Sequence, residues 1–329
     1  MLTMGVNVIN YLFFPDIRFL LTMLIYPYNF MVFLFVVWMF QKDMETAKIY
    51  TFYGLVASVI IQLSVTQFFD FGYRGYRGTA GFENPNQLAY WVLLTGSMIV
   101  FLRRGEVLRV SDWCVLGILT YLQALALSKA GIIAFLVFLL LLFITPKISR
   151  MGYALGALAI ICAIFYTMYD PERVGRIYSN IEPLQNVVAR IEGIGTEADD
   201  TPEARGYYRI IEYPIYTLFG SGEGAFYRFN AEGYNRELHS GIATIIFSYG
   251  LFGAALFGSF LLLIIYRQPW YYVLLFAPVL MFGLPHQSFR FAHFWVFLGI
   301  NYGIFLAQYR RDLKHKVEDG LEYLKEKAG

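Results

Sequence analysis

The sequence is short of charge, of cysteine and of known catalytic signatures. Charged residues make up 15% of its 329 residues and hydrophobic residues 58%, whereas soluble domains carry roughly 25% charged residues. Its two cysteines, Cys114 and Cys162, stand inside apolar runs, which fits small core residues rather than a disulfide or a metal pair. No HExxH motif, Walker loop or cluster of metal-ligand residues occurs, so we expect no metal and no cofactor. A net charge of +2 indicates no nucleic-acid partner.

Long apolar runs dominate instead. A membrane-crossing helix needs roughly 20 apolar residues, and many segments approach that length. We therefore predict an all-α, polytopic transmembrane protein of about nine spans, or ten if the first fourteen residues form another, with residues 1–329 as one membrane domain. The predicted spans are Phe19–Phe40, Ile49–Phe69, Gln87–Leu102, Trp113–Leu127, Gly131–Thr145, Met151–Tyr169, Gly241–Tyr266, Trp270–Pro285 and Phe291–Gln308.

The basic residues predict the orientation of these spans. Seven of the eight lysines fall on one side, with the tail 309–329, which we predict to be a short solvated helix in the cytoplasm. Eleven of the eighteen arginines fall on the other side, many of them in residues 170–240, which we predict to be a large external loop with amphipathic helices. Arginine grips phosphate at two points, unlike lysine. The excess of arginine on the outer side therefore suggests a phosphate ligand. Compositional drift is the alternative explanation for this excess.

Two groups of candidate residues flank predicted spans on this outer side. Arg74 and Arg77 lie in a glycine-rich stretch before an Asn-Pro-Asn helix start, where we expect Asn86 to cap the next helix. Their guanidinium groups could wrap an anion or contact lipid headgroups. Lys129 lies in a tight turn between two apolar helices, and it either faces a polar cavity or snorkels to the interface.

Further candidates lie in or after the external segment. A helix from about residue 204 would place Arg205 and Arg209 on one face, unless they form surface salt bridges with acidic neighbours. His239 follows Glu237 at the entry to the next span. A neutral imidazole there is a natural general base, or else a structural contact. A looser set fits packing or lipid contact better: His286, Arg290 and His293.

Four motifs recur in order over about residues 70–305. Arg77 precedes F-x-NPN-x-LA, S-K-A-G opens an apolar helix, an arginine stands about fifteen residues before G-S-G-E-G, and E-L-H-S precedes a helix containing YGLFG. This set resembles the O-antigen polymerase and O-antigen ligase superfamily. The resemblance implies a C-class glycosyltransferase in the bacterial cytoplasmic (inner) membrane. Its donor would be an undecaprenyl-diphosphate-linked oligosaccharide, and it would act on the outer face without a metal ion.

The resemblance also implies which residues bind the diphosphate. Arg77 matches the arginine before the NPN motif, with Arg74 beside it. Arg205 matches the arginine of the external loop, with Arg209 as the alternative alignment. Lys129 stands where the family usually has arginine, and this change is not equivalent, because lysine lacks the two-point grip.

The catalytic pair implied by the resemblance is His239 with Glu237. His239 would take the proton of the acceptor hydroxyl, and Glu237 would orient it if the segment is extended. Polymerase and ligase share these motifs, so the glycan acceptor separates them: a growing glycan, or lipid A-core. Family members commonly have more spans before the large loop. The rival classes are a lipid-linked oligosaccharide flippase and a scaffold that joins polysaccharide-assembly partners while its arginines touch membrane lipids.

The predicted topology can be tested by reporter fusions. A reporter fused after Asp200 should lie outside the cytoplasm, and reporters fused after Arg104 or at Gly329 should lie inside it, because the lysine-rich loops fix that side. If the Asp200 and Arg104 fusions report the same side, the span assignment is wrong.

Overall fold

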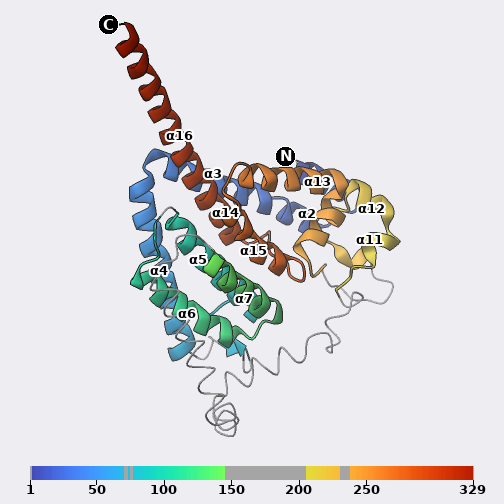
Figure 1. Cartoon of the computed structure of the whole chain (residues 1–329). Helices are drawn as coiled ribbons and strands as arrows, with labels where there is room; N and C mark the ends of the chain where they lie inside the picture. The colour runs from blue at the N-terminus through green and yellow to red at the C-terminus, as the bar shows by residue number, and fades with distance from the viewer. Residues whose placement is uncertain are drawn as a thin grey trace.

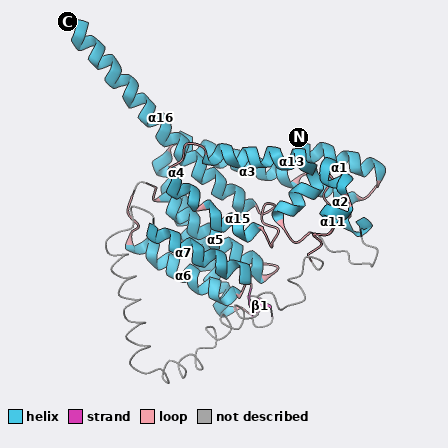
Figure 2. Ribbon diagram, turned by 45° about the vertical axis from the view of Figure 1, so that its right-hand side comes forward, coloured by secondary structure: helices cyan, strands magenta, loops and turns pink. Residues whose placement is uncertain are grey.

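The computed structural model describes residues 2–69, 73–74, 77–104, 106–144, 205–229 and 238–328. This part of the chain is almost entirely helical (Figure 2), and it includes four helical stretches long and apolar enough to cross a membrane. The predicted all-α class is confirmed for these residues, and the four stretches support the predicted membrane character. The predicted span Met151–Tyr169, most of the loop 170–240 and Glu237 lie outside the described residues, so the count of nine spans stays a prediction. The four long stretches are Ile17–Lys42, Met44–Phe68, Pro85–Leu102 and Gly241–Ile265.

The N-terminal region forms four helices, where we predicted two spans and left the first fourteen residues unassigned. Residues 2–13 form a short helix, and its role as a tenth span stays a prediction. The next apolar run breaks near Met23 and Leu24 and then continues to Lys42. Asp43 begins the following helix, because its carboxylate accepts a hydrogen bond from the backbone N–H of Thr46 at 3.1 Å. These helices are α1 (Leu2–Phe13), α2 (Ile17–Thr22), α3 (Ile25–Lys42) and α4 (Met44–Phe68).

Helix α5 (Pro85–Leu102) is the centre of the fold. Every residue from Leu88 to Leu102 is buried, and α4, α6 (Val110–Ala126), α7 (Lys129–Ile144), α15 (Phe276–Gly283) and α16 (Ala292–Ala328) pack around it. The predicted cap is wrong by two residues. Asn84, not Asn86, accepts the hydrogen bond from Gln87 N–H, and Pro85 occupies the first helical position, where a missing N–H does no harm.

The two last predicted spans differ from the expected pattern. Trp270–Pro285 is divided at Leu275 into α14 (Trp270–Leu274) and α15. The last span and the tail form one helix, α16, whose C-terminal part projects away from the body (Figure 1). The tail is helical with exposed side chains over residues 310–320, as predicted, but it continues the span rather than forming a separate helix.

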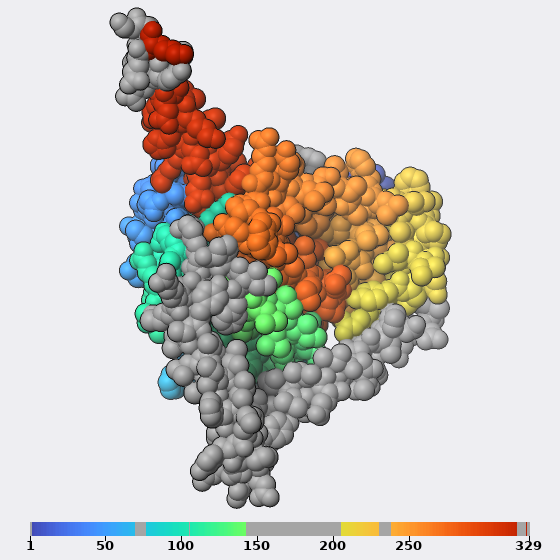
Figure 3. Space-filling view, viewed as in Figure 1, coloured from blue at the N-terminus to red at the C-terminus, as the bar shows by residue number. Residues whose placement is uncertain are grey.

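The described part of the external segment, residues 205–229, lies along the first half of α13 (Gly241–Ile265). The predicted single helix from residue 204 is wrong, because the chain turns at Tyr213, before Pro214. Two short helices result, α11 (Arg209–Glu212) and α12 (Pro214–Phe219), followed by the 3-10 helix η3 (Phe226–Phe229). Helix α12 packs on α13, and the space-filling view shows this segment in yellow against the orange helix (Figure 3).

A break in α13 at Gly250 receives the glycine-rich turn that follows α12. Gly250 has φ 73° and ψ 176°, outside the helical region. In an unbroken helix the carbonyls of Phe247 and Ser248 would accept from N–H groups four residues on. Here they accept hydrogen bonds from the N–H groups of Ser221 and Gly222, both at 2.9 Å. Backbone groups freed in an apolar helix need partners, so the turn completes α13.

The interlock between break and turn requires glycine. A Cβ on Gly250 would overlap the carbonyl oxygen of Leu218, and one on Gly220 would lie 2.7 Å from the carbonyl oxygen of Ser248. Both glycines have positive φ, a conformation that other residues rarely adopt. We name this interlock, formed by residues 218–222 and 247–250, the α13 junction.

A glycine substitution tests the α13 junction. Gly250→Ala should lower the free energy of unfolding by about 2 kcal/mol or more, because both the positive φ and the overlap are unfavourable. Gly258→Ala is the matched control in the same helix, since a Cβ there meets nothing within 4 Å, and it should be neutral or stabilising. Thermal unfolding of both purified variants in detergent measures the difference. Equal midpoints would show that the interlock is loose.

Candidate functional site

Arg77 connects the first two groups of candidate residues. It lies in a short hairpin of β1 (Tyr73–Arg74) and β2 (Arg77–Gly78), in which Arg74 pairs with Arg77. Its Nε donates to the carbonyl oxygen of Ala126 at 3.2 Å, and its Nη2 donates to Asn86 Oδ1 at 3.3 Å. The hairpin therefore rests on the turn between α6 and α7. Asn86, which we expected to cap α5, instead orients this guanidinium.

The same turn carries Lys129. Leu127 ends α6 in the left-handed conformation, and Lys129 begins α7 as a half-buried residue. The buried Ser128 hydroxyl accepts a hydrogen bond from Gly131 N–H at 3.3 Å. Arg77 and Lys129 thus flank one tight turn, as a joint anion site requires. For Arg74 the structure describes the backbone only.

Arg205 and His239 come together although 34 positions separate them. The His239 N–H donates to the carbonyl oxygen of Arg205 at 3.3 Å. Arg205 Nη1 donates to the carbonyl oxygen of Pro285 at 2.7 Å, and Gly241 N–H donates to that of His286 at 2.9 Å. The His239 side chain is exposed and Arg205 is half-buried, so both can meet a ligand from outside the helices.

Arg209 does not share the surroundings of Arg205. Gly206, with φ 73°, turns the chain between them, so the one-face relation expected from a regular helix does not hold. Arg209 is only 1% exposed, and its guanidinium lies against the Tyr208 ring at 5.7 Å. Of the two alternatives for a clamp, Arg205 is the accessible one. Glu237 lies outside the described residues, so its role as the partner of His239 stays a prediction.

The segment 284–290, between α15 and α16, holds this second group in place. Six of its seven carbonyl oxygens accept hydrogen bonds from side chains or backbone outside the segment. Gln287 Nε2 also donates to the carbonyl of Leu238, next to His239, at 2.6 Å. The six donors, in the order of the carbonyls, are Tyr207, Arg205, Gly241, Phe291, Trp295 and Asn29.

Aromatic contacts link the two groups of residues. Asn86 stands one turn before Tyr90 on α5. The Tyr90 ring stacks on Phe282 with 4.7 Å between centroids, and Phe282 contacts the His286 ring at 4.9 Å. These rings connect the N-terminal part of α5 with His286, in the segment that binds Arg205 and Gly241.

An ion pair that the sequence did not predict lies behind this site. Glu223, in the G-S-G-E-G turn, is fully buried. Its carboxylate accepts hydrogen bonds from Arg290 Nε and from the Tyr249 hydroxyl, and its N–H donates to Asn7 Oδ1 at 2.8 Å. In the sequence, the feature that could have indicated this ion pair was a glutamate within a glycine-rich turn. Arg290 proves to be paired with an acid, whereas His293 is packed, stacking on Trp91.

Arg228 fixes the N-terminal helices to the same turn. Its Nη1 donates to Asn10 Oδ1 at 3.3 Å, and its Nη2 donates to the carbonyl oxygen of Ser221. The guanidinium lies 4.9 Å from the Phe19 ring and 4.7 Å from the Phe229 ring. Burial lowers the pKa of Arg228. This arginine belongs to the framework of the site rather than to its accessible surface.

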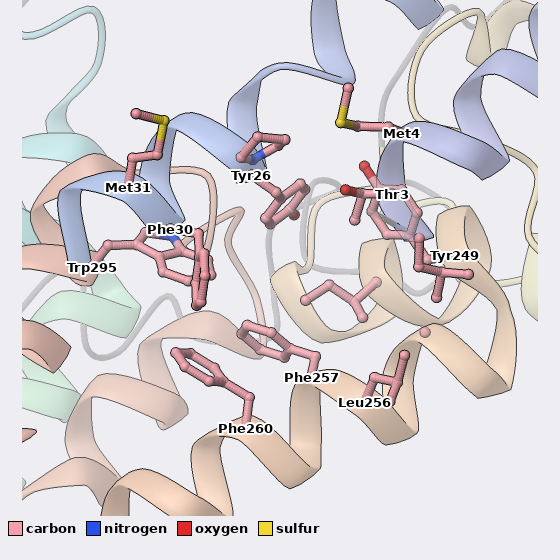
Figure 4. Close-up of a pocket in the computed structure, with 14 residues that line it drawn as sticks. Thr3, Met4, Tyr26, Phe30, Met31, Tyr249, Leu256, Phe257, Phe260 and Trp295 are labelled. Carbon is pink, nitrogen blue, oxygen red and sulfur yellow. The ribbon is translucent and has the colours of Figure 1, made fainter. Parts of the chain in front are cut away.

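An apolar groove of about 570 Å³ lies between α1, α3, α13 and α16 (Figure 4). Two of its walls, α3 and α13, belong to the stretches of membrane-crossing length. Its lining includes exposed apolar side chains such as Met31 and Leu256. Tyr249 also lines it, and the hydroxyl of that residue binds Glu223. The groove is therefore adjacent to the buried ion pair.

Comparisons with protein families, with curated proteins and with solved structures give no match to this chain. The described residues define a helical protein, and four stretches long and apolar enough to cross a membrane indicate a membrane protein.

Proposed function

We propose that this chain is a membrane glycosyltransferase that extends or transfers an undecaprenyl-diphosphate-linked glycan on the outer face of the bacterial cytoplasmic membrane. The observation that carries the proposal is the backbone hydrogen bond from the His239 N–H to the carbonyl oxygen of Arg205. It brings together a candidate phosphate-binding residue and a candidate general base from motifs 34 positions apart, next to the ends of apolar helices. Arg77, at the N-terminal end of α5, supplies a second guanidinium.

The chemistry needs only these groups. A glycosyl diphosphate already carries its leaving group, so the protein must neutralise the charge that develops on it and take one proton. The acceptor oxygen attacks the anomeric carbon while the carbon–oxygen bond to the diphosphate breaks. The bonding electron pair leaves with the diphosphate, held by Arg77 and Arg205, and the proton passes to the His239 imidazole. A single displacement inverts the anomeric carbon.

The apolar groove supports a lipid-linked donor. A polyprenyl tail needs an apolar channel open to the bilayer, and the groove between α3 and α13 has that character. The growing glycan is our preferred acceptor, and a lipid A-core acceptor would make the protein a ligase. A flippase would need ionisable residues through its span centres, and the apolar runs carry almost none.

Arginine substitutions test the diphosphate clamp. Arg77→Ala and Arg205→Ala should each reduce glycan extension about a hundredfold or more, the usual effect of removing one donor to developing charge. Arg205→Lys should also lose most activity, because the two-point grip is lost. Arg109→Ala is the control, since Arg109 is exposed and lies at the opposite end of α5. Near-normal extension by Arg205→Lys would show that simple charge attraction suffices.

Substitution of His239 tests the base. His239→Ala should reduce turnover by about a hundredfold or more while leaving donor binding nearly unchanged, because the arginines hold the donor. His315→Ala, in the exposed tail, is the control. Turnover and binding are measured on the same purified variants with synthetic donor and acceptor. Weak binding with normal turnover of bound donor would make His239 a phosphate contact instead.

A further inference from the structure

The buried pair Glu223–Arg290 lies between the α13 junction and the segment that holds the site. Glu223 follows directly on Ser221 and Gly222, whose N–H groups bind the broken helix. Its position is thus set by backbone hydrogen bonds that do not involve the site. Arg290 is the last residue of segment 284–290. The pair therefore connects a fixed point to the segment whose carbonyls accept from Arg205 and Gly241.

Neither member of the pair is placed to react. Glu223 is fully buried, and its two carboxylate oxygens are occupied by Arg290 and Tyr249. A buried carboxylate is unfavourable unless it is paired and hydrogen-bonded. Because the buried carboxylate needs this partner, it fixes the position and the orientation of Arg290. The end of segment 284–290 is thereby fixed as well. The backbone of Arg290 is held as well, because its carbonyl oxygen accepts from Asn29 Nδ2 at 3.0 Å.

We propose that Glu223 and Arg290 are positioning residues, which set the placement of Arg205 and His239 through segment 284–290. Arg205 reaches the segment at Pro285, and His239 is held through its neighbours Leu238 and Gly241. A shift of the segment would move the phosphate-binding group and the base relative to each other. Displacements of about 1 Å at such sites lower turnover by up to about a hundredfold.

The test compares two buried ion pairs of similar exposure. Breaking one partner alone leaves a buried charge and risks misfolding, so the variant is the neutral pair Glu223→Gln/Arg290→Gln. The control is Asp112→Asn/Arg103→Gln. In that pair Arg103 binds Asp112 at 2.9 Å and 3.0 Å, the arginine is 14% exposed and the acid is fully buried, against 20% and fully buried for Arg290 and Glu223. The control pair lies at the opposite end of α5.

Two readouts are measured on each folded variant: amide hydrogen exchange in peptides covering 238–244 and 284–291, and kcat for glycan extension. We expect the Glu223/Arg290 variant to exchange about tenfold faster or more in these peptides and to lose about tenfold or more in kcat. The control variant should match wild type in both readouts, whatever its thermal stability.

Of the two readouts, only kcat rests on the proposed function. The outcomes therefore test the inference and the proposed function separately. If both double variants behave alike in exchange and in kcat, the pair is structural and the inference is overturned. It is also overturned if kcat falls while exchange stays at the wild-type rate. If exchange rises only in the Glu223/Arg290 variant but the wild type makes no glycan, the positioning role stands and the proposed function fails.

Discussion

The structure depends on one backbone interaction: two carbonyl groups of α13, beside the break at Gly250, are satisfied by the N–H groups of Ser221 and Gly222. Within an apolar helix, carbonyl groups without partners would be strongly unfavourable. The glycine-rich turn supplies those partners and is fixed by them in return. Because the turn also carries Glu223, the same interaction places a buried carboxylate, which then places Arg290. Arg290 in turn sets the position of segment 284–290, and the segment sets the positions of Arg205 and His239.

The site has two kinds of charged residue, which burial distinguishes. Glu223, Arg209 and Arg228 lie in the interior or against aromatic rings, and they hold elements together. Arg205 and His239 are reachable from outside, and hydrogen bonds to the carbonyl oxygens of Pro285 and Arg205 help to place them. The Arg205 guanidinium is held by its hydrogen bond to Pro285 before any anionic ligand binds, and electrostatic catalysis requires charged groups with such a preset orientation.

The helical class and most helix bounds could be predicted from apolar length alone, because burial in lipid and burial in protein select the same side chains. Helix α5 was predicted within two residues of its observed start. Other predictions were wrong because neighbouring residues favour different local structures. Asn84 and Asn86 both suit a cap, and only the position of Pro85 decides between them. The turn at Tyr213 follows from the proline after it, which the periodicity of apolar residues had masked.

For the site, the resemblance implied that Arg205 and His239 serve one ligand, but nothing in the sequence indicated the hydrogen bonds that join their backbones and hold them. Backbone carbonyls carry no sequence signature, so this region suggested only a loose set of His286, Arg290 and His293. The Glu223–Arg290 pair joins residues 67 positions apart, and nothing in the local sequence of either one indicates the other. Long-range pairs of this kind emerge only once the break in α13 brings the turn and the segment together.

The most direct measurement uses the wild-type protein in liposomes with a synthetic undecaprenyl-diphosphate-linked oligosaccharide. Our account predicts products lengthened by whole repeat units, with one undecaprenyl diphosphate released for each bond formed, at the membrane face that carries Arg205 and His239. Movement of unextended donor from one leaflet to the other, with no diphosphate released, would contradict the account and indicate a transporter.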